Sequence, residues 1–227
     1  MGRKYTPFKS NEEFQNAITK IASELYAAAI NYDLYSHLVN LSQKYKKEYF
    51  RGRQFWGMVQ DGFLLQAVMT LCRVYDIDDD RTNSLETILR RQMKTNMNRA
   101  GIADMQADIQ LVGRSDPVVS RLRGWRNHAL AHTNQGFAIR DEKLPKSMIP
   151  FRDELMLLID RGTDIVLRNG GASVSRDLSH EYVPRKEIDF VFESIKEKMN
   201  YTKAEIRVWL EKNGINPDVL LDHEKQK

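Results

Sequence analysis

The sequence predicts an all-α fold, and three observations support this prediction. Apolar residues recur at three- and four-residue spacing over most of the chain, which is the spacing of one helix face. Only 12 Gly and 6 Pro occur among 227 residues, too few for the frequent turns of an all-β chain. Hydrophobic residues make up 41% and charged residues 29%, so a hydrophobic core can form. We therefore expect an up-and-down helical bundle.

The first predicted helix covers residues 10–46. It begins at Ser10, whose hydroxyl is expected to accept a hydrogen bond from the backbone three residues on, while Glu13 reaches back. Apolar side chains then follow at helical spacing to the predicted end. One long amphipathic helix is therefore expected at the start of the chain.

A second helix is predicted over residues 53–75, where Gly57 and Gly62 are expected to let a neighbouring helix approach closely. Cys72 lies in its apolar part and is interpreted as a small core residue rather than a nucleophile. The acidic run 76–80 ends this helix. It lacks the glycine and glutamate positions of a calcium loop, so we interpret it as a solvated turn.

The middle of the chain has clear helix-start signals. Asn83 or Ser84 is expected to cap a third helix, and the weakly periodic stretch 96–113 predicts a short helix within a loop. Asp116 followed by Pro117 is typical of a cap and a first helical position, and the helix they open is expected to end near residue 132.

The last third of the chain is predicted to hold a bundle helix and a separate helical appendage. Helices are expected over residues 152–167, 184–199 and, after a second capping box, 202–214. The segment 168–173 contains two glycines and resembles a hinge. We therefore predict two domains: a helical bundle of residues 1–170 and a small C-terminal helical appendage of residues 171–227.

One heptapeptide, residues 126–132, combines Arg126, Asn127, His128 and His132 near the predicted end of a helix. On a helix the two histidines are about 40° apart on one face, and Arg126 lies about 120° from His132. The negative end of a helix favours the imidazolium form of histidine, which can donate a proton.

Three interpretations of this heptapeptide are open from the residues alone. It can be an ordinary polar helix end. It can be a zinc-binding histidine pair, although Ala129 stands where a zincin has its glutamate. It can also be a phosphate site in which arginine binds the anion and histidine transfers the proton.

The pattern of arginine, a polar residue and a histidine late in an all-α chain resembles the signature of the HEPN superfamily. Residues 55–61 and 67–76, followed by Asn83, Ser84 and Leu85, are similar to the AbiU-type (abortive-infection) branch. In that branch an aromatic-rich helix ends in an Arg-x-x-Asp turn, here Arg73 to Asp76, before a Ser-Leu helix start. The resemblance covers roughly residues 10–170.

This resemblance implies a HEPN-like bundle and a metal-independent endoribonuclease that acts as a homodimer with a composite cleft. Arg126 would hold the phosphate oxygens and His132 would act as general acid or base, with Asn127 orienting and His128 assisting. It further implies a toxin or antiphage defence effector, RNA as partner, no metal or cofactor, and a possible antitoxin of nucleotidyltransferase type. A non-catalytic helical module that binds RNA or a protein is the alternative.

Charge gives a modest indication of an RNA partner. The chain has 35 basic and 31 acidic residues, and residues 81–126 hold nine basic residues against four acidic ones. Arg121, Arg123 and Trp125 are candidate RNA-binding residues, through phosphate contacts and base stacking.

The chain has a single cysteine and no apolar run of the roughly 20 residues that a membrane-spanning helix needs. We therefore expect a cytoplasmic protein without a membrane contact.

Overall fold

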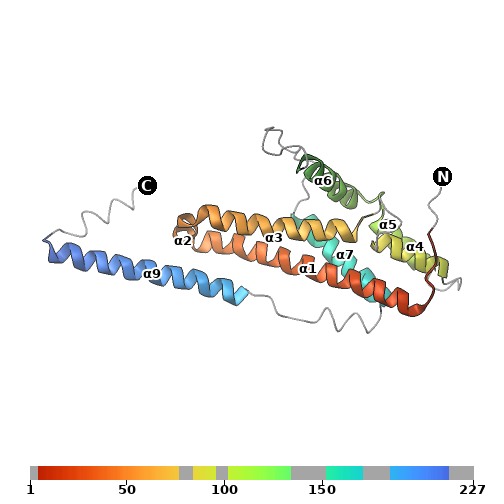
Figure 1. Ribbon diagram of the computed structural model, residues 1–227, viewed down its shortest axis with the longest axis horizontal. Helices are drawn as coiled ribbons and strands as arrows, with labels where there is room; N and C mark the ends of the chain where they lie inside the picture. Colours follow the sequence, from red (N-terminus) through yellow and green to blue (C-terminus); the bar gives the residue numbers. More distant parts are fainter. Residues whose placement is uncertain (1–4, 77–83, 96–101, 134–151, 171–184, 215–227) are drawn as a thin grey trace. The chain divides into compact units, whose positions relative to one another are not determined.

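The computed structural model describes residues 5–76, 84–95, 102–133, 152–170 and 185–214 (Figure 1). Within these ranges all regular secondary structure is helical and no strand occurs, so the all-α prediction is confirmed. The helices are α1 (Asn11–Lys44), α2 (Lys46–Arg51), α3 (Arg53–Val74), α4 (Leu85–Thr95), α5 (Ile102–Val112), α6 (Pro117–Thr133), α7 (Arg152–Gly170) and α9 (Arg185–Lys212).

The chain forms two compact units. The first contains the described parts of residues 1–35 and 60–182, and the second those of 36–59 and 183–227. Long helices α1 and α3 contribute to both units. The predicted domain boundary after residue 170 stays a prediction, although α9 shares its unit with residues 36–59, which the sequence placed in the bundle.

Inside the second unit, an aromatic cluster holds α9. Phe192 is fully buried, and its ring centroid lies 4.5 Å from that of Trp56 and 5.8 Å from that of Tyr45. His37 Nε2 and Asp189 Oδ1 add a hydrogen bond of 2.8 Å. Aromatic burial of this kind contributes more than the partly exposed polar contact beside it.

Helix α9 is a single helix, so the predicted break between residues 199 and 202 is wrong. The Thr202 hydroxyl donates to the carbonyl oxygen of Lys198 at 2.9 Å instead of capping a new helix. This bond to the preceding turn satisfies the hydroxyl inside a continuous helix. Helix α2, which fills the gap between the two long N-terminal helices, was also not predicted.

In the first unit, α7 approaches α1 and the end of α3 closely at Gly162 (Figure 1). A Cβ atom at Gly162 would lie 2.7 Å from Leu25 Cδ2 and 3.0 Å from Tyr75 Oη. Tyr75 is 1% exposed, and its hydroxyl donates to the carbonyl oxygen of Leu158 at 2.5 Å. The buried Tyr75 therefore links the residue after α3 to α7.

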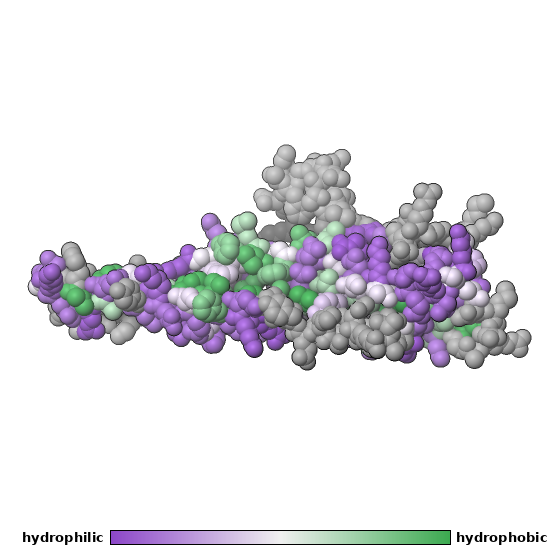
Figure 2. Space-filling model, turned by 60° about the horizontal axis from the view of Figure 1, so that its bottom comes forward, coloured by the Kyte–Doolittle hydropathy of each residue, from purple (hydrophilic) through white to green (hydrophobic). Residues whose placement is uncertain are grey.

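The predicted close approach at Gly57 and Gly62 is wrong. Among the described residues, nothing lies within 4 Å of a Cβ atom built at either position. Helix α3 also exposes Phe55, Met58 and Leu65, and Figure 2 shows hydrophobic side chains at the surface among hydrophilic ones. None of the described helices has the length and apolar character that crossing a bilayer requires.

The predicted helix starts at Ser10 and Ser84 are confirmed. Ser10 Oγ accepts from the backbone N–H of Glu13 at 3.1 Å, and Glu13 Oε2 accepts from that of Lys9 at 2.8 Å. Ser84 Oγ accepts from the backbone N–H of Thr87 at 3.3 Å. Each hydroxyl thus satisfies an amide that has no partner within its own helix.

We expect Gly162→Ala and Gly62→Ala to change stability in opposite directions. Both replace a helical glycine in the same unit and gain up to about 1 kcal/mol of helix propensity. Only the methyl group at position 162 must displace Leu25 and the Tyr75 hydroxyl, so this variant should lose about 1–2 kcal/mol net. Urea unfolding followed by circular dichroism measures both, and equal effects would contradict the close contact.

Candidate functional site

Helix α6, which carries the heptapeptide, begins at a cap that also joins it to α7. Asp116 Oδ1 accepts from the backbone N–H groups of Val118 and Val119 at 2.9 and 3.0 Å. Its other oxygen, Oδ2, pairs with Arg161 of α7 at 2.9 Å. The prediction of a cap followed by Pro117 as the first helical residue is confirmed.

The buried residues of α6 show on which side of this helix Arg126 lies. Val119 and Leu122 are fully buried, and Cys72 of α3 lies against the Leu122 carbonyl with an S···O distance of 3.9 Å. At about 100° per residue, position 126 falls between Val119 and Leu122 around the helix. Arg126 thus lies at the inner edge of α6, near the end of α3, rather than on the outer face.

Arg126 is ion-paired with Asp76, the second residue after α3, with an Nη1···Oδ2 distance of 2.8 Å. The two side chains are only 15% and 22% exposed. Because guanidinium is planar and its donors have fixed directions, this pair orients the whole group.

For Asp76, the interpretation as part of a solvated turn is therefore wrong; residues 77–80 lie outside the described residues. The Arg-x-x-Asp spacing from Arg73 to Asp76 was the sequence signal that marked this carboxylate.

The other candidate catalytic residues lie on the same helix, but their side chains are outside the described part of the structure. The backbone of α6 is helical through Asn127, His128 and His132. Helix geometry places His132 about 120° around from Arg126 and about 9 Å along the axis, and His128 about 160° around. Their roles stay predictions.

The three candidate RNA-binding residues differ in their surroundings. Arg121 forms an ion pair with Glu154 of α7 at 3.1 Å, and both side chains are mostly buried. Arg123 and Trp125 are half-buried. Arg121 therefore has a contact within the chain, and RNA binding by all three residues stays a prediction.

Part of the basic surplus of residues 81–126 is neutralised within the chain. Three arginines of this segment pair with carboxylates that lie outside it. These pairs are Arg91 with Glu13 (2.6 Å), Arg121 with Glu154 (3.1 Å) and Arg126 with Asp76 (2.8 Å). In the other direction, Asp116 pairs with Arg161 (2.9 Å) and Asp108 with Arg168 (2.6 Å), both of α7. These pairs with residues outside the segment therefore lower its basic surplus by only one charge.

Cys72 is a core residue, as predicted. It is 2% exposed, and burial raises the pKa of its thiol to about 12, while the nearby Arg126 guanidinium opposes this shift only in part. A thiol with so high a pKa is almost entirely protonated at neutral pH, whereas the nucleophile is the thiolate.

The described residues contain no group of three His, Cys, Asp or Glu side chains close enough to hold a metal ion. The side chains of His128 and His132 lie outside the described part of the structure and were not part of this comparison. The expectation of no metal therefore stays a prediction.

A family model described as AbiU2, of the HEPN type, matches residues 11–169, about seven-tenths of the chain. The matched range contains the whole heptapeptide and Asp76. No curated protein and no solved structure gave a significant match. The resemblance to the AbiU-type branch of the HEPN superfamily is confirmed.

We expect Asp76→Asn to lower the free energy of unfolding by about 1–3 kcal/mol, because it leaves a mostly buried guanidinium without its counter-charge. Glu24→Gln is the matched control. It breaks the Glu24–Arg73 pair, in which the arginine is 53% exposed, and should cost less than about 1 kcal/mol. Urea unfolding compares the two variants, and equal losses would show that burial of the Arg126 pair is unimportant.

Cys72 should resist alkylation in the folded protein between pH 7 and 9, because burial raises its pKa to about 12 and restricts access. Mass spectrometry after iodoacetamide treatment, with and without urea, provides the measurement. Rapid labelling of the folded chain would mean that α3 and α6 separate at this contact.

Proposed function

The chain belongs to the AbiU2 family of HEPN proteins, and on this basis we propose that it is an endoribonuclease that cleaves RNA without a metal ion. The observation that carries this proposal is the position of the heptapeptide. It lies on one continuous helix within the matched range, and Asp76 orients its arginine.

The reaction would use the 2′-hydroxyl of the substrate as nucleophile. Its oxygen forms a new bond to phosphorus, the bond from phosphorus to the 5′-oxygen breaks, and the products are a 2′,3′-cyclic phosphate and a 5′-hydroxyl. A base takes the proton of the 2′-hydroxyl and an acid gives one to the leaving 5′-oxygen. Arg126 would neutralise the charge that develops on the non-bridging oxygens.

His132 would act as general acid or base, Asn127 would orient the phosphate or the histidine, and His128 would assist. The reaction needs both an acid and a base, and each subunit offers one motif. A homodimer that brings two motifs into one cleft would supply both groups.

Family membership also favours a role in defence, since AbiU names an abortive-infection system. We propose that cleavage of cellular RNA makes the protein a toxin or antiphage effector. An antitoxin of nucleotidyltransferase type is a possible neutralising partner.

A non-catalytic helical module that binds RNA or a protein is the second candidate. The observation that favours it is that Arg121 and Arg126 pair with Glu154 and Asp76 of the same chain. Such pairs are typical of arginines that stabilise helix packing.

Incubation of the protein with end-labelled RNA in EDTA tests the proposal. We expect fragments that end in a 2′,3′-cyclic phosphate, and a loss of about 100-fold or more in rate for His132→Ala and Arg126→Ala. Arg51→Ala, which removes an exposed arginine of α2, is the control and should retain activity.

Circular dichroism must show that each variant is folded, because Arg126→Ala also breaks the pair with Asp76. Unchanged cleavage by folded His132→Ala would contradict the assigned mechanism. RNA binding without any cleavage by the wild-type protein would favour the second candidate.

A further inference from the structure

Helix α2 connects the end of α1 to the start of α3 in the second unit, and none of its residues is buried (Figure 1). Large apolar side chains nevertheless lie at the surface here. Phe50 of α2 is 70% exposed, and Phe55 and Met58 of α3 are 61% and 75% exposed. Packing within the second unit does not account for these three side chains, and exposed apolar groups of this size point to a contact outside the chain.

The same region is strongly basic. Residues 44–53 contain five basic residues and one acidic residue, whereas the whole chain has a net charge of only +4. Lys46, Lys47 and Arg53 are exposed, and none of them pairs with a carboxylate of the residues that the structure describes. On α2, Lys46 and Lys47 lie four and three residues before Phe50, so that cations and an apolar side chain are neighbours. We use the name α2–α3 surface for Lys46, Lys47, Phe50, Arg53, Phe55 and Met58.

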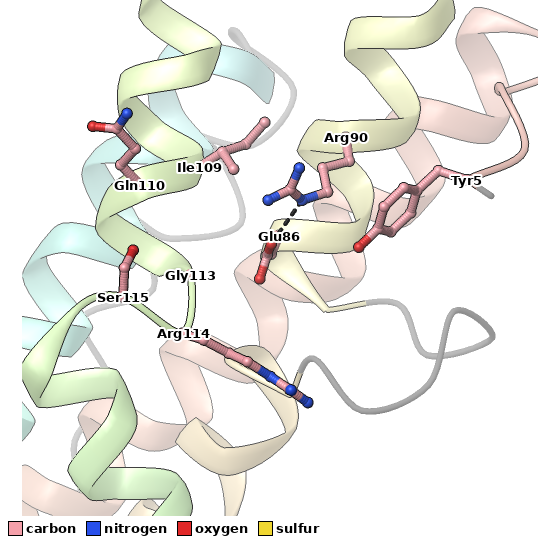
Figure 3. A pocket seen from close by; sticks show the side chains of 8 residues that line it. All are labelled: Tyr5, Glu86, Arg90, Ile109, Gln110, Gly113, Arg114 and Ser115. Carbon is pink, nitrogen blue, oxygen red and sulfur yellow. Dashed lines mark hydrogen bonds and ion pairs between the residues drawn. The ribbon is translucent and has the colours of Figure 1, made fainter. Parts of the chain in front are cut away.

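Two arginines of α4, in the first unit, have a different environment. Figure 3 shows a pocket of about 410 Å³ beside this helix, where Arg90 donates to Glu86 at 2.6 Å. Arg91, the next residue, pairs with Glu13 at 2.6 Å. Both of these cations are neutralised by the fold, whereas the charges of the α2–α3 surface can attract an external anion.

Both ends of α2 are fixed to α9 by aromatic contacts. Tyr45 precedes α2 and Trp56 follows it, and their ring centroids lie 5.8 and 4.5 Å from that of the buried Phe192. The Trp56 ring also lies against Gly52, where a Cβ atom would come within 2.9 Å of it. These contacts hold α2 from its two ends, so its exposed side chains are carried on a fixed support.

We propose that the α2–α3 surface binds an anionic lipid bilayer from its aqueous side. Lysine and arginine attract the negative headgroups, and each strengthens binding by roughly fivefold. Phenylalanine and methionine side chains gain free energy on transfer from water to the boundary between headgroups and acyl chains. The expectation of no membrane contact rested on the lack of a membrane-spanning segment, which a surface contact of this kind does not need.

RNA is the other polyanion that an exposed basic and aromatic surface can bind. Its bases stack on flat rings, and Met58, the most exposed of the three apolar side chains, has no ring. Hydrocarbon suits all three apolar side chains, so the α2–α3 surface favours a bilayer. The heptapeptide is not part of this surface, and binding to lipid is measured without cleavage. Failure of the endoribonuclease proposal therefore leaves this one intact.

Sedimentation of the full chain with lipid vesicles tests the proposal, with phosphatidylcholine alone and in an equal mixture with phosphatidylglycerol. We expect binding to the mixture to be at least about tenfold tighter and to weaken as salt screens the charges. Lys46→Gln combined with Lys47→Gln should weaken it by about tenfold or more. The control, Lys9→Gln combined with Lys20→Gln, removes the same charge from exposed residues of the first unit and should leave binding unchanged.

Insertion of an apolar side chain distinguishes a bilayer contact from charge attraction alone. Phe50→Cys can be labelled selectively with an environment-sensitive dye, because Cys72 is buried. We expect the emission of this dye to shift to shorter wavelength on the mixed vesicles, whereas the same dye at Lys20→Cys should not respond. Phe50→Ser changes an exposed side chain and should weaken vesicle binding by about tenfold.

An RNA oligonucleotide with 2′-O-methyl groups, which cannot be cleaved, measures the alternative. If the paired substitutions of Lys46 and Lys47 weaken RNA binding while the wild-type protein binds no vesicles, the α2–α3 surface binds RNA and the proposal is wrong. Absence of vesicle binding, equal binding to both kinds of vesicle, or a dye at position 50 that does not respond also overturns it. Circular dichroism verifies that each variant is folded, and if one is not, the comparison of lipids with the wild-type protein still decides.

Discussion

The position of the candidate site depends on the close contact of α7 with Leu25 and Tyr75 at Gly162. The Tyr75 hydroxyl is buried and bonds to the Leu158 carbonyl, so the chain cannot shift at the end of α3 without losing this bond. Asp76 is the next residue, and its carboxylate holds Arg126. The packing of α7 against Tyr75 thus helps to position Asp76, and through it the Arg126 guanidinium of α6.

Helix α6 is held at several points that use different kinds of interaction. Asp116 caps its start and pairs with Arg161 of α7, Leu122 is buried against Cys72, and Arg121 pairs with Glu154. Hydrophobic burial determines which face of α6 points inward, and the ion pairs join this helix and its cap to α7 and to Asp76. Together they place Arg126 opposite Asp76 in one defined rotation.

Features that depend on neighbours in sequence could be predicted, and features that depend on distant partners could not. Ser84 and Asp116 bond to amides two or three residues on, so their patterns predicted the helix starts correctly. Gly162 looks like any helical glycine, because Leu25 and Tyr75 are far away in the sequence. Thr202 resembled a cap, yet its hydroxyl had an acceptor four residues back. The basic surplus of residues 81–126 was likewise visible, but the distant partners of its charged side chains, such as Glu13, Glu154 and Arg168, were not.

The directions in which residues 126 and 132 lie around the axis of α6 give a reason why the proposed reaction would use two copies of the chain. Asp76 holds Arg126 on the inward face, whereas helix geometry places position 132 about 120° around and about 9 Å further along the axis. General acid–base catalysis requires the histidine within hydrogen-bond reach of the oxygen that gains or loses a proton, and the arginine on the same phosphate. Along a single straight helix the two positions are therefore offset both around and along the axis. A second motif, related by a two-fold axis, can bring the histidine of one copy to the arginine of the other. In this proposal, the offset between the two positions is a reason for a dimer in addition to the need for both an acid and a base.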